Sequence, residues 1–270
     1  MDVKNHNMNK EKPIMRKRLK VIAFLAFFLG IVLAVSQYFE FVSKTVYEES
    51  VSRLTEVFHQ SDNMLGELTH KNLMYLHMWS EYLQDAPSES KIRDYIDKAQ
   101  KDAGFLYFYF LSADGNYKMT TGETGYLGLQ ENIEDEIQKG NDIITNAAVP
   151  GKSQMLVFAS PKAHGSYQGF KYDAIAIAYE NADIVNVLDI SAFNGKAKSY
   201  VLHPDGRVVI DHSLESWGNV YNFFGILREH TDISEKEILK ISKKFKEGHT
   251  GAMLLNLDGK DYYLVYEKSD

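Results

Sequence analysis

An unbroken run of 19 uncharged residues, VIAFLAFFLGIVLAVSQYF at 21–39, most constrains what this 270-residue chain can fold into. A helix of this length is roughly 28 Å long, close to the thickness of the hydrocarbon core of a bilayer. A secretory signal peptide is the alternative, but its apolar core usually spans about 7–15 residues and ends in a small-residue cleavage site. Here the run ends in aromatic residues typical of a membrane interface, so the sequence predicts an uncleaved transmembrane helix.

Charge is distributed unevenly on the two sides of this run. Residues 1–20 carry seven Lys and Arg against two acidic residues, whereas the rest of the chain carries 23 basic and 35 acidic residues. The positive-inside rule therefore predicts a cytoplasmic basic arm at 1–20, a single N-terminal span in the cell membrane, and an extracytoplasmic location after about residue 40. Nucleic acid is not an expected partner, because the acidic exterior lacks the surplus of Lys and Arg that phosphate binding needs.

A regular apolar pattern follows the membrane segment. Apolar residues recur at alternating steps of four and three between Tyr47 and Tyr82, with no proline over about five heptads. This spacing predicts a long signalling helix over 43–84. Ser61 and Asn72 interrupt the seam with polar groups. We therefore expect the membrane-near part to form a homodimer with a second copy and the far part to pack on its own domain.

The next stretch has the signals of a mixed helix and strand unit. Pro87 ends the long helix, and Ser88 is placed to cap a second helix over 89–103 that Gly104 closes. The chain is free of cysteine, so such a unit must rely on its hydrophobic core. The remaining expected elements are a strand at 105–112, a turn at 113–116, a strand at 117–121, a glycine-rich loop at 122–128, a helix at 130–140, and strands at 154–160 and 172–179 joined by the loop 161–169.

The order of elements then begins again around a second Asp-Gly pair. YFLSADGNYKM at 109–119 and YVLHPDGRVVI at 200–210 are both apolar runs divided by an Asp-Gly turn. Ser234 and Glu237 form a capping box for a helix at 235–247. Two further strands are expected at 251–257 and 261–266. The chain outside the membrane is thus predicted to form two units, 85–192 and 193–270.

Taken together, these parts resemble the double Cache (tandem PAS-like) extracytoplasmic sensor region of bacterial transmembrane receptors. The resemblance is carried by the basic arm, the span, the long helix and the two Asp-Gly hairpins, with Phe158-Ala159-Ser160-Pro161 and 199–211 as short matching strings. It implies an α+β fold in which a membrane-distal PAS-like unit at 85–192 is followed by a membrane-proximal one at 193–270.

The resemblance also implies a function. Such receptors bind a small-molecule ligand outside the cell and relay the signal to a cytoplasmic histidine kinase, diguanylate cyclase or chemoreceptor tail. This chain is therefore expected to be a fragment of a longer receptor, with a free-standing sensor subunit as the alternative. One branch of the family binds amino acids through Arg-x-Trp-Tyr near the end of the long helix. Met78-Trp79-Ser80-Glu81-Tyr82 stands there without the arginine, so the amino-acid ligand class is not carried over.

A ligand pocket is expected in the distal unit, built from alternate side chains on one sheet face and closed by the long helix. The aromatic cluster at 107–110 also fits a simple core. The candidates combine apolar walls with hydroxyl and carboxylate groups, as a small polar ligand needs. The candidate residues are Trp79, Tyr82, Tyr109, Met119, Phe158, Ser160, Tyr172, Asp173 and Tyr179.

Three other patterns favour plain structure over chemistry. Ser88-Glu89-Ser90-Lys91 has the Ser-x-x-Lys spacing of some acyl-enzyme hydrolases, but a helix cap explains the serine. His70 and His77 lie seven residues apart without a matching carboxylate, so they are expected to be solvated surface histidines. The evenly spaced glycines at 122–128 fit a flexible loop better than a dinucleotide site. We expect no catalytic residue, metal or cofactor; a membrane-anchored hydrolase and an adhesion or scaffold module are the alternative functions.

Overall fold

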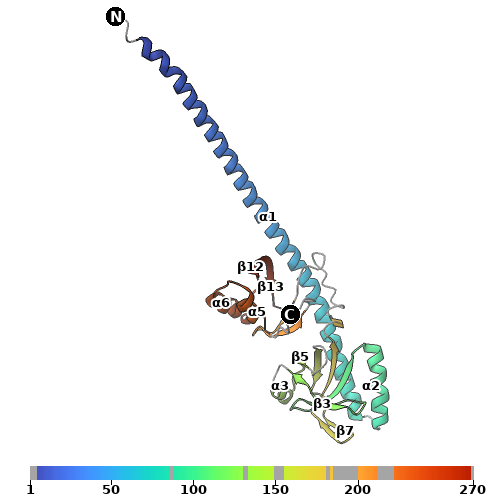
Figure 1. Ribbon diagram of the computed structural model, residues 1–270. Coiled ribbons are helices and arrows are strands. Elements are labelled where there is room, and N and C mark those ends of the chain that lie inside the picture. The colour runs from blue at the N-terminus through green and yellow to red at the C-terminus, as the bar shows by residue number, and fades with distance from the viewer. Residues whose placement is uncertain are drawn as a thin grey trace. The chain divides into compact units, whose positions relative to one another are not determined.

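The computed structural model describes residues 5–85, 88–129, 133–148, 155–180, 183–184, 200–211 and 222–268, and Figure 1 shows their helices and strands. The chain divides into two compact units, Met1–Arg53 and Leu54–Asp270. One helix, α1 (Asn5–Asp85), begins in the first unit and continues into the second, and it contains the helix predicted over 43–84.

The part of α1 in the first unit has the properties of a membrane span. Its large apolar side chains between Val21 and Phe41 are exposed rather than packed against protein. Among the described residues, α1 is the one helix long and apolar enough to cross a membrane, by length and composition.

The second unit is built around a seven-stranded antiparallel sheet with the strand order β3-β2-β1-β9-β6-β5-β4. A two-stranded ribbon, β7-β8, accompanies it. The elements of this part are α2 (Glu89–Ala103), β1 (Tyr107–Leu111), β2 (Asn116–Lys118), β3 (Thr124–Tyr126), β4 (Gly128–Leu129), α3 (Ile133–Lys139), β5 (Ile143–Ala148), β6 (Met155–Ser160), β7 (Gly165–Tyr167), β8 (Phe170–Tyr172) and β9 (Ala174–Glu180). The predicted α+β class is therefore confirmed.

Local signals placed the ends of α2 correctly. The Ser88 side chain accepts a hydrogen bond from the backbone N–H of Lys91, and Gly104 closes the helix in the left-handed conformation with φ of 76°. Gly104 also donates its N–H to the carbonyl of Gln100. These contacts explain Ser88 as a helix cap.

The predicted loop at 122–128 is wrong, because two strands form there. Gly125 lies in β3, where it pairs with Tyr117 of β2. A Cβ at Gly125 would stand 2.7 Å from the Tyr117 hydroxyl, so the glycine leaves room for the Tyr117 ring to lie over β3. The predicted loop 161–169 likewise contains β7, and β5 was not predicted because polar residues interrupt its apolar pattern.

The C-terminal part of the second unit has its own apolar cluster, formed mainly by α5, α6 and β12. Its described strands pair two by two, β10 with β11 and β12 with β13. The capping box of Ser234 and Glu237 is present at the start of α6, as predicted. The elements of this part are β10 (Tyr200–Leu202), β11 (Val208–Asp211), α5 (Phe223–His230), α6 (Glu235–Lys246), β12 (Gly251–Leu257) and β13 (Lys260–Tyr266).

Candidate ligand site on the seven-stranded sheet

Strand register divides the predicted site residues between the two faces of the large sheet. Tyr109 of β1 and Ala159 of β6 both pair with Ala176 of β9, so these three side chains share one face. Phe158 pairs with Ile177, the next residue along β9, and so belongs to the opposite face. Tyr109 and Phe158 therefore lie on opposite faces, and the prediction that both line one face of the sheet is wrong.

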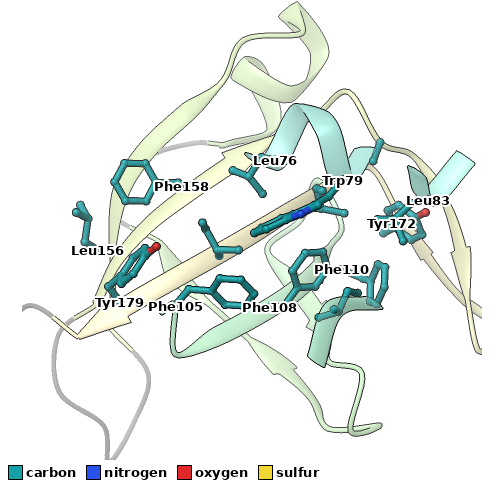
Figure 2. Close-up of a cluster of buried hydrophobic side chains, with 14 of the residues drawn as sticks. Leu76, Trp79, Leu83, Phe105, Phe108, Phe110, Leu156, Phe158, Tyr172 and Tyr179 are labelled. Carbon is teal, nitrogen blue, oxygen red and sulfur yellow. The ribbon is translucent and has the colours of Figure 1, made fainter. Parts of the chain in front are cut away.

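One face, which we call the helix face, packs against α1 and α2 (Figure 2). Trp79 of α1 is 3% exposed, stacks on Tyr75 with ring centres 5.5 Å apart, and meets Phe105 edge-on. The Tyr179 hydroxyl donates to the Oδ1 atom of Asn72, which ties β9 to α1 by a buried hydrogen bond of 2.8 Å. Five of the nine predicted site residues lie in this core: Trp79, Phe158, Ser160, Tyr172 and Tyr179.

The opposite face, which we call the tyrosine face, holds Tyr107, Tyr109 and Tyr117 with Met119 and Met155. The Tyr109 and Tyr117 rings meet at 4.8 Å in an edge-to-face arrangement, and Tyr107 lies 5.9 Å from Tyr109. Tyr107 and Met119 are only half-buried, so they form the accessible edge of this face.

A carboxylate lies beside the tyrosine face. The Tyr117 hydroxyl donates to Glu123 Oε1 at 3.3 Å. Burial raises the pKa of Tyr109, and the neighbouring phenols and Glu123 raise it further. Burial and then Glu123 likewise raise the pKa of Tyr117. Both phenols therefore remain neutral hydrogen-bond donors at physiological pH, next to one negative charge.

An open hollow of about 460 Å³ adjoins this face at the end of the β1-β2 hairpin. Tyr117 lines the hollow and belongs to the tyrosine face, whereas Phe170 lines the hollow and packs against the core of the helix face. The lining residues are Ser112, Asp114, Asn116, Tyr117, Thr124, Gly125, Gly169, Phe170 and Lys171.

The two remaining predicted residues lie away from both faces. Asp173 is exposed, and its Oδ2 atom accepts a hydrogen bond of 2.9 Å from the backbone N–H of Ala113, so it supports the Asp-Gly turn. Tyr82 stacks on Tyr95 of α2 with ring centres 3.9 Å apart and joins the two helices.

His77 was expected to be a solvated surface residue, and this expectation is wrong. Its ring lies between Asp142, with Nε2 2.7 Å from Oδ2, and Lys162, with Nδ1 3.1 Å from Nζ. His70 is exposed, as expected. No group of three His, Cys, Asp or Glu suited to a metal ion occurs within the described ranges.

Burial of the tyrosines gives a testable pH dependence. Burial raises the pKa of Tyr179 to about 12, the bond to Asn72 lowers it by a smaller amount, and Tyr75 raises it slightly. This folded-state pKa exceeds the unfolded value of about 10. The contribution of neutral Tyr179 to the free energy of unfolding is therefore complete below pH 10 and is lost as pH rises toward 12. The melting temperature of the full chain should thus fall more steeply over this range than that of Tyr179→Phe.

Exposed Tyr126 provides the control for this effect, because it is 60% exposed. Tyr126→Phe should keep the steep alkaline decrease of the parent chain in differential scanning calorimetry. A Tyr179→Phe variant as alkali-sensitive as the parent would show that Tyr179 does not contribute to it.

Comparison with known proteins supports the fold. Neither a scan of protein-family models nor a search of curated proteins gives a match. Among solved structures, the chain is similar to the ligand-binding domain of the amino acid chemoreceptor PctB of Pseudomonas aeruginosa PAO1 in complex with L-Arg, with a TM-score of 0.52 and 15% identity over 80% of this chain and 87% of that chain.

Two further solved structures agree. The ligand-binding domain of the chemoreceptor PctC of the same organism, in complex with GABA, has a TM-score of 0.50 and 14% identity over 79% of this chain and 90% of that chain. The extracellular domain of mmHK1S-Z3, assigned as a histidine kinase, has a TM-score of 0.50 and 12% identity over 78% of this chain and 89% of that chain. The chain therefore has the fold of the sensory, Cache-type ligand-binding domains of chemoreceptors and histidine kinases.

Proposed function

We propose that this chain is the extracytoplasmic ligand-sensing region of a membrane-bound bacterial signal-transduction receptor. One observation carries the proposal: a sheet with the fold of sensory ligand-binding domains is joined, through the single helix α1, to the apolar segment at 21–39. The distal unit at 85–192 senses the ligand, and the proximal unit at 193–270 follows it in the chain. Residues 1–20 remain in the cytoplasm.

The ligand binds at the tyrosine face, where half-buried Met119 is accessible to it and the ring of Tyr109, which is 1% exposed, lies behind the accessible edge. Aromatic ring faces attract ammonium groups, and a carboxylate adds to this attraction. Glu123 has no ion pair with any described Lys or Arg, so its charge is available to a ligand. We therefore propose an organic amine as the ligand class. The ligands in the similar PctB and PctC structures, L-Arg and GABA, each carry an ammonium group.

Binding is relayed through the sheet to the helix face. Trp79 of α1 shares one buried core with Phe158, Tyr172 and Tyr179, and Tyr82 connects α1 to α2. The sheet and α1 adopt two arrangements, and the amine binds one of them more tightly. Binding shifts the equilibrium toward that arrangement, and the size of the shift is limited by the difference in the amine's affinity for the two arrangements. A parallel dimer through α1 then passes the change to a cytoplasmic output domain, a histidine kinase or diguanylate cyclase.

Thermal-shift screening of the full chain in detergent micelles tests the site and the ligand class together. The probes are choline and putrescine, with amino acids, organic acids and sugars as the other classes. An amine at about 100 times its dissociation constant should stabilise the chain by about 2.7 kcal/mol, which raises the melting temperature by roughly 5–10 °C.

Matched variants locate the effect. Glu123→Gln removes an exposed charge without disturbing the core, and it should reduce the shift by about half or more. Tyr167→Phe alters a buried tyrosine in the core of the helix face, and this variant should show the same thermal shift as the parent. The proposal fails if no class of small molecule stabilises the chain, or if turnover of a probe reveals a hydrolase.

A further inference from the structure

A cluster of three ionisable side chains joins α1 to two segments of the sheet. His77 lies on α1, Asp142 immediately precedes β5, and Lys162 follows β6. The His77 Nε2 atom is 2.7 Å from Asp142 Oδ2, and the Lys162 Nζ atom is 3.1 Å from His77 Nδ1. The His77 and Asp142 side chains are 31% and 23% exposed, so protons from solvent reach them while most of each group is covered.

The two contacts determine which ring nitrogen carries the hydrogen. A lysine ammonium only donates hydrogen bonds, so Nδ1 of His77 must be the acceptor for Lys162. Nε2 then bears the hydrogen and donates it to Asp142. The geometry thus fits a neutral imidazole between one cation and one anion, with no net charge on the three groups together.

A proton added to this ring acts on its two partners in opposite ways. It binds at Nδ1, which turns an acceptor into a donor that faces the Lys162 ammonium at 3.1 Å. The bond to Asp142 becomes charge-assisted and persists. Protonation therefore breaks the contact between the Lys162 side chain and α1, while the segment before β5 stays attached.

Two further features bear on this cluster. Asp142 Oδ1 is buried and accepts no hydrogen bond from a described residue. Burial of this unpaired oxygen is unfavourable, and a positive charge on His77 stabilises the Asp142 carboxylate. The other charged or titratable groups near the ring in sequence are Glu81, one turn along α1, and His164, two residues beyond Lys162. The ring's described ionic contacts are with Asp142 and Lys162.

From this geometry we propose that the distal domain responds to extracytoplasmic protons as well as to its ligand, through His77. Histidine is the side chain that ordinarily titrates between about pH 5 and pH 8. Acidification over this range loosens α1 from the segment after β6. One hydrogen bond then remains between them, from Gln84 Nε2 of α1 to the Lys162 carbonyl at 3.0 Å. The proposal is independent of the ligand class, because it concerns the other face of the sheet.

Spin labels test this directly, because the chain has no native cysteine. Cysteines replace exposed Met78 of α1 and exposed His164, and electron paramagnetic resonance gives the distance distribution between labels in the full chain at pH 8 and pH 5. The labelled parent should show a one-proton transition to a longer or broader distribution. His77→Gln and Lys162→Met should each abolish the transition, and His70→Gln should retain it.

Two outcomes overturn the proposal. One is a distribution in the labelled parent that is the same at both pH values. The other is a transition that persists in either His77→Gln or Lys162→Met, because the mechanism needs both the ring and the cation it repels. Lys162 is an exposed side chain, so Lys162→Met keeps the fold even if the ring substitution perturbs it.

Discussion

Replacing Trp79 with alanine is expected to lower the free energy of unfolding by about 3–5 kcal/mol. The side chain is 3% exposed, and its ring contacts Tyr75 of the same helix as well as Phe105 and Phe108 next to and within β1. Truncation removes these contacts and leaves a cavity between α1 and the sheet. Urea denaturation of the full chain in detergent, followed by circular dichroism, measures the loss.

A neighbouring residue provides the control. Met78 is on the same helix but is 48% exposed. Met78→Ala is expected to change the free energy of unfolding by no more than about 0.5 kcal/mol. Equal effects of the two substitutions would mean that α1 does not pack on the sheet through Trp79.

The second large effect is expected at the Asp-Gly turn of the C-terminal part. Gly206 has φ of 87°, and a Cβ there would overlap the buried ring of Phe224. Gly206→Ala should therefore cost about 1–2 kcal/mol for the left-handed backbone, and about 1–3 kcal/mol more for displacing the ring. Differential scanning calorimetry of the full chain should show a lowered transition.

Gly259 separates these two contributions. It also has a positive φ, 78°, but no other side chain or backbone atom lies within 4 Å of the point that a Cβ would occupy. Gly259→Ala should cost only the backbone contribution of about 1–2 kcal/mol. If both substitutions lower stability equally, the packing of Phe224 against the turn is not what makes Gly206 necessary.

Features encoded by neighbouring residues were predictable from the sequence. Ser88 and Gly104 delimit α2, and Ser234 with Glu237 begins α6, because caps depend on side chains within four residues of each other. The helix over 43–84 and the paired strands at 251–266 follow from periodicity in the same way. The α+β class follows from these elements together.

The arrangement of the site depended on distant pairings. Tyr109 and Phe158 lie on opposite faces because of the register of β1 and β6 against β9, and a shift of one residue in either pairing would exchange the faces. No local signal distinguishes these alternatives. The strand at Gly125 was missed for a similar reason, since the side chain that packs on this glycine, Tyr117, belongs to the partner strand.

The ionic cluster on α1 had no sequence signature either. Asp142 and Lys162 are 65 and 85 residues from His77 along the chain, so no fixed spacing links them. Glu123 was also missed, although Tyr117 and Glu123 are only six residues apart. The turn between β2 and β3 brings the two side chains together. This pairing was not predicted, because residues 122–128 were predicted to form a loop.

Isothermal titration calorimetry of the full chain with the amine that most raises the melting temperature tests the central claim most directly. The account predicts saturable binding at one site per chain. It also predicts an affinity reduced at least tenfold in Glu123→Gln, with Tyr167→Phe within twofold of the parent. Binding that is unaffected by Glu123→Gln, or the absence of saturable binding by any small molecule, would contradict a ligand sensor that uses the tyrosine face.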